Sequence, residues 1–388
     1  MRVLFSTQPA MGHFRPLVPL AKAFIARGHE VRVACAKSFI PEVEREGLVG
    51  IPAGYDFLVG EASKAFPNMP PAGPLRMPWM IPFWCRMTAT AMAPDLEAIV
   101  EAFRPALLVR EYLEYGACFS AEKRGLPHVV AGPVWFRGEP SVEESLKGAC
   151  EDLGLPPSEA MAIPFRHAVY AAMPPEWVAD GEVVPKTTHF VRPETADGGN
   201  SKAAPKWISE LPEGRPVVHV TLGTTEANRT PGLYRTLVDA LRGEPYEVVV
   251  SMGRDFAPDE TGAPAGNVRV ERYVDHAALL PRCTVVVSNG GYGTLMASLA
   301  HGLPSVIVPI QADQPRNASQ AAHLGFAEVV TRPSWTVDAI RAAVRRVLDS
   351  PHYAERARDV MRSMAALPTV DRSIPEMEAL AQANRPKT

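Results

Sequence analysis

Short apolar runs alternate with apolar stripes of helical period along the chain. Residues 1–7 (MRVLFST) form one such run, residues 17–25 carry a helical stripe, and residues 29–36 return to a strand pattern. Continuous runs rich in Val and Ile are typical of strands that are buried on both faces of a parallel sheet. The pattern therefore predicts a β-α-β unit over residues 1–36.

The same alternation continues to residue 310, with interruptions at residues 55–90 and 196–205. The stretch 196–205 (ADGGNSKAAP) is small and polar, as a linker is. We therefore predict an α/β fold of two Rossmann-like domains that face each other across a cleft: residues 1–195, a linker at 196–206, and residues 207–388. The last helix of the chain is a candidate to return to the N-terminal domain. Strands are expected at residues 106–109, 128–131, 168–172, 189–191, 217–221, 248–251, 268–270, 285–287 and 305–310, and helices at 91–103, 120–124 and 232–241.

Residues 55–90 differ from the rest because they are rich in proline, methionine and tryptophan and sustain no period until their end. We expect a long loop here. One interpretation is a proline-braced surface loop whose aromatic side chains insert into the core. The other is the wall of an apolar acceptor pocket, since methionine and aromatic side chains suit adaptable apolar binding. The candidate acceptor-binding residues are Trp79, Met80, Phe83, Trp84 and, after a later strand, Trp135.

Composition narrows the class of protein. The 388 residues are 46% hydrophobic and 21% charged, as in globular proteins, and the net charge of −3 gives no reason to bind nucleic acid. The five cysteines are scattered without a Cys-x-x-Cys pair, which favours reduced thiols in a cytoplasmic enzyme. No stretch approaches the length of a membrane span. We expect no nucleic-acid or membrane partner, and either a monomer or a homodimer.

The most informative stretch is residues 284–317. A predicted strand at 285–287 runs into the turn SNGGYGT, a helix follows to about residue 301, and a second strand leads to Asp313 and Gln314. Glycines let a ligand approach the backbone, and the amides at a helix start attract a phosphate. Asp313 and Gln314 offer groups for sugar hydroxyls at a strand end, where open α/β sheets bind ligands. Phosphate beside polyol recognition indicates a nucleotide sugar, although a glycine turn alone often serves only to reverse the chain.

Three segments carry a resemblance that spans nearly the whole chain: MGHFRPLVPLAKAFIARGHEV, NVRVERYVDHAALL and SNGGYGTLMASLAHGLPSVIVPIQADQPRNA. Together they resemble the nucleotide-sugar-dependent glycosyltransferases of the two-Rossmann-domain (GT-B) class, in the bacterial macrolide and antibiotic-tailoring branch of family 1. The resemblance implies transfer of a sugar from a TDP- or UDP-sugar to an apolar natural product.

The resemblance also implies roles for individual residues. His13, in the loop after the first strand, corresponds to the general base that deprotonates the acceptor hydroxyl. Its acidic partner, normally aspartate, is Glu111 here, which keeps the charge but lengthens the side chain. Asn289 stands where many relatives have a histidine against the donor phosphate, so it can donate a hydrogen bond but supplies no positive charge.

The remaining donor-binding roles are implied in the same way. Glycines and threonines of two turns would meet the diphosphate, Tyr273 and Val274 would lie against the nucleobase with His276 nearby, and Asp313 and Gln314 would hold sugar hydroxyls. The residues expected around the diphosphate are Gly223, Thr224, Gly290, Gly291, Gly293 and Thr294.

The expected chemistry requires no metal and no cofactor beyond the nucleotide sugar. The sequence has no Asp-x-Asp motif and no histidine pair with zinc-ligand spacing. Helix amides would offset the charge of the leaving diphosphate, and one displacement with one base predicts inversion at the anomeric carbon. The alternatives are a non-catalytic homologue that assists a transferase, and a nucleotide-sugar epimerase. A dinucleotide-dependent oxidoreductase is disfavoured because the first loop, QPAMGHF, has one glycine.

Overall fold

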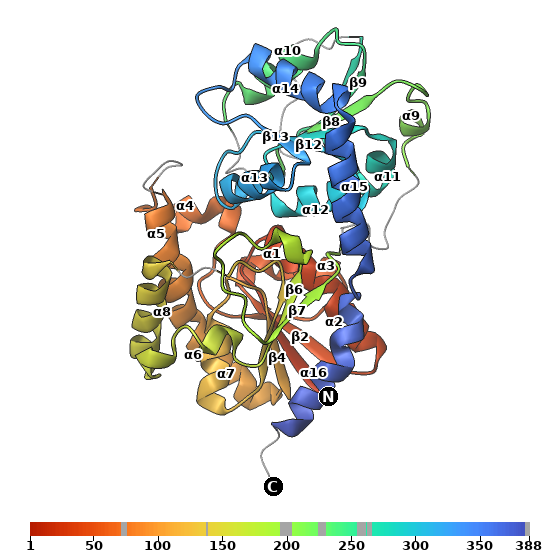
Figure 1. The fold of residues 1–388 in the computed structure, drawn as a ribbon. Coiled ribbons are helices and arrows are strands. Elements are labelled where there is room, and N and C mark those ends of the chain that lie inside the picture. The colour runs from red at the N-terminus through yellow and green to blue at the C-terminus, as the bar shows by residue number, and fades with distance from the viewer. Residues whose placement is uncertain are drawn as a thin grey trace. The chain divides into compact units, whose positions relative to one another are not determined.

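The computed structural model describes residues 1–70, 76–136, 139–194, 204–223, 230–253, 261 and 266–384 (Figure 1). The chain divides into two compact units: unit 1 is Met1–Glu194 with Leu367–Thr388, and unit 2 is Thr195–Ala366. Each unit contains one sheet whose neighbouring strands are all parallel, which confirms the predicted α/β class. Most of the predicted linker, residues 196–203, lies outside the described residues.

The sheet of unit 1 has the order β3-β2-β1-β4-β5-β6-β7. The predicted strands are all present, and the edge strand β3 is an addition that the sequence did not indicate. The strands are β1 (Arg2–Ser6), β2 (Glu30–Cys35), β3 (Gly50–Pro52), β4 (Leu107–Arg110), β5 (His128–Gly132), β6 (Ala168–Ala172) and β7 (Thr188–Val191). The helices are α1 (Met11–Phe14), α2 (Val18–Ala26), α3 (Ile40–Arg45), α4 (Ala62–Ala65), α5 (Arg76–Pro82), α6 (Thr88–Phe103), α7 (Gly116–Arg124), α8 (Pro140–Leu153) and α16 (Ile374–Ala383).

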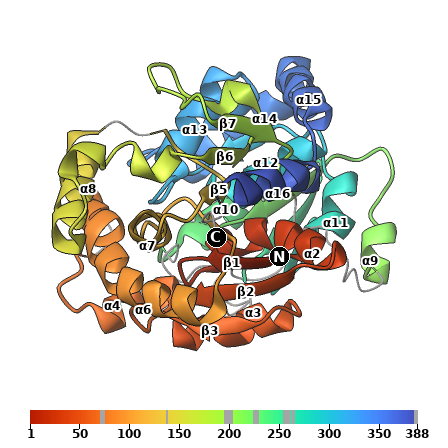
Figure 2. The same cartoon turned by 90° about the horizontal axis from the view of Figure 1, so that it is seen from below.

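The C-terminal helix α16 packs against α2 at the other end of the chain, and both views show them side by side (Figures 1 and 2). Ile374 and Met377 are buried in the same apolar cluster as Phe24 of α2. At the surface, Arg27 donates a hydrogen bond to Glu378 at 3.0 Å. Residues from both ends of the sequence therefore build one core in unit 1.

The expectation of a long loop over residues 55–90 is wrong for its second half. α5 runs from Arg76 to Pro82, and the π-helical turn Phe83–Met87 joins it to α6. Proline removes an amide donor and disturbs the hydrogen-bond ladder of a helix, so a widened turn directly after Pro82 has a physical cause. The aromatic residues of this segment thus stand on a helix.

The sheet of unit 2 has the order β10-β9-β8-β11-β12-β13. The strand expected over residues 305–310 ends at Ile307, because Pro309 has no N–H for the ladder. The strands are β8 (Val217–Thr221), β9 (Glu247–Ser251), β10 (Val268–Glu271), β11 (Val285–Ser288), β12 (Ser305–Ile307) and β13 (Ala327–Val329). The helices are α9 (Lys206–Ser209), α10 (Leu233–Leu241), α11 (His276–Leu279), α12 (Tyr292–Ala300), α13 (Gln314–His323), α14 (Val337–Asp349) and α15 (Pro351–Ala366).

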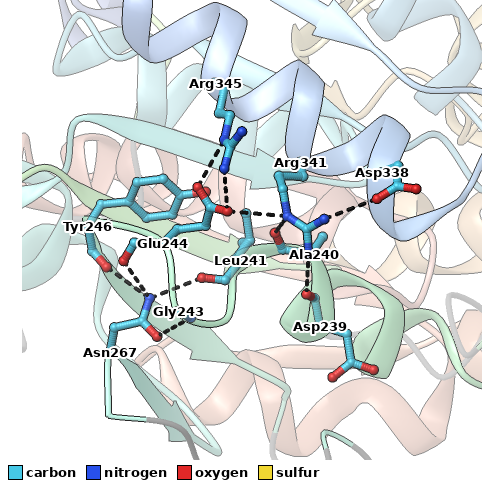
Figure 3. A network of polar contacts seen from close by, with 10 residues as sticks. All are labelled: Asp239, Ala240, Leu241, Gly243, Glu244, Tyr246, Asn267, Asp338, Arg341 and Arg345. Carbon is cyan, nitrogen blue, oxygen red and sulfur yellow. Dashed lines mark hydrogen bonds and ion pairs between the residues drawn. The ribbon is translucent and has the colours of Figure 1, made fainter.

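A polar network fastens the turn after α10 to the sheet and to α14 (Figure 3). The buried Asn267 amide nitrogen donates to three backbone oxygens of this turn, at 3.0, 3.3 and 3.0 Å. The carboxylate of Glu244 accepts a bidentate pair from Arg345 and lies 3.3 Å from Arg341, both on α14. Paired carboxylate–guanidinium bonds add directional constraint to their charge attraction, so they hold α14 in register with α10.

Among the residues that the structure describes, no helix is both long enough and apolar enough to cross a membrane.

Candidate active site

Because β1 and β4 are neighbouring parallel strands, the residues that follow them leave the same end of the sheet. This arrangement brings the side chains of His13 and Glu111 together. Ser6 pairs with Arg110 at the ends of these strands, and the amide of the next residue, Glu111, donates to the Ser6 carbonyl at 3.2 Å. The loop after β1 leads into α1, which carries His13. His13 Nδ1 lies 3.0 Å from Glu111 Oε2, and the two side chains are 24% and 4% exposed.

The Glu111 carboxylate is held by backbone amides as well as by the imidazole. Leu113 N donates to Oε2 at 2.8 Å, and Gln8 N donates to Oε1 at 3.4 Å. A carboxylate oxygen only accepts, so we assign the proton of neutral His13 to Nδ1 and the lone pair to Nε2. Sequence reasoning did not find Leu113 and Gln8, since backbone donors leave no residue-type signal.

One of the candidate acceptor-binding side chains, Trp84, lies beside His13. The Trp84 ring lies 6.2 Å from His13 between centroids, and Trp79 stacks on Phe83 at 5.0 Å. Phe83 and Trp84 are 2% and 8% exposed, so these two belong to the core, as the alternative interpretation expects. Trp79 and Met80 are half-buried.

The last acceptor candidate, Trp135, comes from the segment after β5. It is half-buried and packs edge-on against Tyr112 at 5.4 Å. Tyr112 directly follows Glu111 in the chain, so this aromatic pair lies next to the dyad in sequence.

In unit 2, the glycine turn leads from β11 into α12. Gly290 has φ +80°, and a Cβ there would meet Ile307 Cγ2 at 2.6 Å, so only glycine fits. Gly291 is the N-cap residue of α12 and makes no side-chain cap. A Cβ on Gly293 would meet nothing within 4 Å, and Thr294 beside it is half-buried. The first turn of α12 is therefore uncrowded on the side of these residues.

Asn289 joins this turn to the turn after β8. Its Nδ2 donates to the Leu222 carbonyl at 2.9 Å, and its Oδ1 accepts from Gly291 N at 3.2 Å. Asn289 is 2% exposed, and both of its amide atoms make these bonds to the backbone. Its side chain therefore supports the two turns. Gly223 follows with φ +79°, and its amide donates to Thr221 Oγ1 at 3.4 Å. Thr224 lies outside the described residues.

Asp313 and Gln314 begin α13, where each makes a bond within the protein. Gln314 Oε1 accepts from the amides of Ile310 and Gln311 at 2.8 and 2.9 Å, which fixes the chain before the helix. Asp313 Oδ2 accepts from Asn317 Nδ2 at 2.6 Å, and the same nitrogen donates to the Gly290 carbonyl at 3.0 Å. Sequence reasoning missed Asn317, although its spacing of four residues from Asp313 places both on one helix face.

The predicted nucleobase residues lie between β10 and α11. Tyr273 is 51% exposed and Val274 is 5% exposed. His276 Nε2 lies 3.4 Å from Nε2 of His219, whose Nδ1 bonds the Val249 carbonyl at 3.0 Å. Burial is the main reason that the pKa of His219 is lowered to about 3, so His219 is neutral. Of these residues, Tyr273 presents the largest surface to solvent.

Glu122, His128 and His167 form the one group in the described residues with metal-ligand composition. Their ligand atoms lie within 4.8 Å of one another. His128 begins β5, whereas Glu111 follows the end of β4, so the group lies at the opposite end of the parallel strands from the dyad. Arg166 Nε lies 2.9 Å from Glu122 Oε1, which also bonds His128 at 3.2 Å. A divalent cation would have to displace the guanidinium, so these contacts are better explained as polar support for the start of β5.

Comparisons with known proteins identify the family to which this chain belongs. Residues 235–380 match the family model described as erythromycin biosynthesis protein CIII-like, C-terminal domain. The chain is 31% identical to 4'-demethylrebeccamycin synthase from Lentzea aerocolonigenes, over 98% of this chain and 99% of that protein. It is 28% identical to 3-alpha-mycarosylerythronolide B desosaminyl transferase from Saccharopolyspora erythraea, over 99% of each.

A solved structure shows the same fold. The glycosyltransferase VinC, in complex with DTDP, superimposes with a TM-score of 0.79 over 99% of this chain and all of that one, at 24% identity. The fold is therefore the two-domain GT-B fold. Together with the near-complete coverage of the relatives, these findings show that the chain belongs to the family of antibiotic-tailoring glycosyltransferases.

Proposed function

We propose that this glycosyltransferase moves a sugar from a TDP- or UDP-sugar to an apolar natural-product acceptor, with inversion, without a metal, and with His13 as base. The observation that carries the proposal is the 3.0 Å contact between His13 Nδ1 and Glu111 Oε2. An imidazole oriented by a buried carboxylate is suited to taking a proton from a hydroxyl group.

The proposed reaction is one displacement. His13 Nε2 takes the acceptor hydroxyl proton, and the acceptor oxygen forms a bond to the anomeric carbon. The bond from that carbon to the diphosphate oxygen breaks, and the nucleoside diphosphate leaves with the electron pair. Glu111 stabilises the imidazolium that forms, while the amides at the start of α12 offset the charge on the leaving group. Attack opposite to the leaving group inverts the configuration.

The donor proposal rests on unit 2. The first turn of α12 is uncrowded at Gly291 and Gly293, and the exposed ring of Tyr273 offers a surface on which the nucleobase of the donor can stack. VinC, whose fold this chain shares, was solved with DTDP. Thymidine diphosphate is therefore the first nucleotide to test, with uridine diphosphate as the second.

Two measurements test the proposal. Thermal shifts with TDP, UDP and GDP should show stabilisation by TDP or UDP, because a ligand that binds only the folded state stabilises it by mass action. Transfer assays on a panel of apolar aglycones, with NMR of the product, should give inverted anomeric configuration and persist in excess EDTA. Retention of configuration, or loss of activity that Mg²⁺ restores, would contradict it.

The donor incubated alone separates the other candidate functions. A changed sugar without an acceptor would indicate an epimerase. Nucleotide binding without any transfer until a second transferase is added would indicate an auxiliary protein. The paired His13 and Glu111 favour catalysis over the auxiliary role.

A further inference from the structure

Arg110, the last residue of β4, is a fully buried arginine directly before the acidic member of the dyad. Its side chain is 0% exposed, among the largest completely buried ones in the protein. A charged side chain is costly to bury, so a buried guanidinium needs hydrogen-bond partners for its fork of donors. The partners that Arg110 uses indicate its role.

All four hydrogen bonds from the Arg110 guanidinium go to backbone carbonyl oxygens. Nη1 donates to the carbonyls of Glu111, Tyr112 and Glu114 at 3.1, 2.9 and 3.3 Å. Nη2 donates to the carbonyl of Pro164 at 2.8 Å. Nη1 therefore binds three carbonyls within residues 111–114 and holds this stretch in a turn. Nη2 fastens the turn to Pro164, which is distant in sequence.

The turn of residues 111–114 supplies the backbone amide that holds the Glu111 carboxylate in place. Its Leu113 amide donates to Glu111 Oε2 at 2.8 Å, the same oxygen that contacts His13 Nδ1. The Leu113 carbonyl accepts from the Gln8 side chain at 3.3 Å. The conformation of the turn therefore fixes where the Glu111 carboxylate stands relative to His13.

We propose that Arg110 is a positioning residue: it shapes the turn of residues 111–114 so that the Glu111 carboxylate is held against His13. This inference rests on the proposed role of His13 as base and extends it to a residue that does not contact that side chain. The physical basis is pre-organisation, since a base held in the productive geometry need not be ordered at each turnover.

Arg110 also has a simpler possible role, as a counter-charge for the buried Glu114, whose ionised form it favours. The two roles differ in what lysine does. Lysine keeps the charge but lacks the planar fork and the length to reach carbonyls on both sides. A role in charge alone survives Arg110→Lys, whereas a role in shaping the turn does not.

The test is a double-mutant cycle with Arg110→Lys and Glu111→Gln, assayed with an alcohol acceptor. We expect Arg110→Lys to lower kcat roughly 10- to 100-fold, the scale of a misplaced catalytic group. The KM for the donor and the nucleotide thermal shift should stay within about twofold of wild type. Because Arg110 acts through Glu111, adding Arg110→Lys to Glu111→Gln should lower kcat less than about twofold further. A wild-type kcat in Arg110→Lys, or full multiplication of the two effects, would overturn the proposal.

Arg282→Lys is the matched control. Arg282 also donates to backbone carbonyls, those of Ile208 and Leu211 at 3.1 and 2.8 Å, but it lies in unit 2. Its substitution tests whether loss of carbonyl-bound arginine lowers stability without changing the pH dependence or size of kcat.

If Arg110→Lys does not fold, Arg110→Gln, which buries no charge, takes its place in the cycle. Failure of both to fold, while Arg282→Lys folds, would make Arg110 a folding residue and overturn the inference.

His13→Ala separates failure of this inference from failure of the proposed function. If His13→Ala transfers sugar to the alcohol at the wild-type rate, the base is wrong and the positioning role falls with it. If His13→Ala and Glu111→Gln are slow but Arg110→Lys is not, the base stands and only the role of Arg110 is overturned.

Discussion

The carboxylate of Glu111 meets Nδ1 of His13 at 3.0 Å, although the side chain is one methylene longer than the aspartate that the family resemblance implies. The added length is accommodated because Leu113 N and Gln8 N bind the same carboxylate from the two loops around it. The departure from aspartate therefore leaves a complete dyad, held by backbone donors on both oxygens.

The first prediction concerns the base. His13→Ala should lower turnover of an alcohol acceptor by roughly two to four orders of magnitude, the usual contribution of a positioned base. The nucleotide thermal shift should remain close to wild type, since the proposed donor contacts lie in unit 2. The acceptor must be an alcohol, because a phenol ionises more readily and needs the base less. Wild-type turnover of the alcohol would refute the assignment.

The second prediction follows from the fit of the glutamate. Glu111→Asp introduces the residue that the family resemblance implies but withdraws the carboxylate by about 1.5 Å, one carbon–carbon bond. It should therefore lose contact with His13 and lower kcat, by an amount similar to Glu111→Gln, roughly 10- to 100-fold for a charge-assisted hydrogen bond. Steady-state kinetics of the two variants side by side checks this. Wild-type activity in Glu111→Asp would mean that the loops readily adapt to the shorter side chain.

Much of the architecture could be predicted from the sequence because buried parallel strands are strongly marked. The strands at 168–172 and 217–221 were predicted with the bounds that the structure gives. β3 and β13 were missed, since each has three residues at a sheet edge, too few to show a period. Residues 76–90 were expected to be irregular because their prolines hid a helix that contains Pro82.

The site was predictable where chemistry resides in side chains and unpredictable where it resides in the backbone. The spacing of His13 and Glu111 relative to strand ends, with the family resemblance, indicated the pair. Three other contacts depend on the conformation of loops: the bond from the Leu113 amide to Glu111, the bonds from the Arg110 guanidinium to backbone carbonyls, and the bond from Asn317 to the Gly290 carbonyl. Such contacts join residues distant in sequence or use groups that every residue has.

The third prediction concerns the phosphate site. Gly291→Asp places a carboxylate at the N-terminus of α12, where we propose that the diphosphate binds. A Cβ at this position would meet only Asn289 Oδ1, at 3.5 Å, so the variant should fold. Charge repulsion should abolish stabilisation by TDP or UDP in a thermal-shift assay.

Gly60→Asp is the control for the added charge. Gly60 lies in unit 1, and a Cβ there would meet nothing within 4 Å. Its nucleotide shift should equal that of wild type. A folded Gly291→Asp protein with an unchanged nucleotide shift would show that the diphosphate binds elsewhere.

The last prediction concerns Glu114, which is fully buried and lies three residues after Glu111. Burial is the main reason that its pKa is raised to about 7 from the ordinary 4.5, against the opposing influence of Ser6 and Arg110. Between pH 4.5 and 7, a larger fraction of the folded protein than of the unfolded chain carries this proton. The contribution to stability is thus complete below pH 4.5 and is lost as the pH rises through 7.

Glu114→Gln cannot ionise and should remove this loss. Relative to wild type, its free energy of unfolding should be higher at pH 8 than at pH 5, by up to about 3 kcal/mol, on the scale of 1.36 kcal/mol per pKa unit. Denaturant titrations of both proteins at the two pH values measure the difference. Comparison at each pH cancels the titration of all other groups, and the glutamine oxygen can still accept from the Ala117 amide, as Glu114 does at 3.1 Å.

Glu101→Gln, at a side chain 77% exposed, is the control and should follow wild type at both pH values. If Glu114→Gln also follows wild type in parallel, Glu114 is ionised in the folded protein throughout, and the buried charge must be balanced by Arg110.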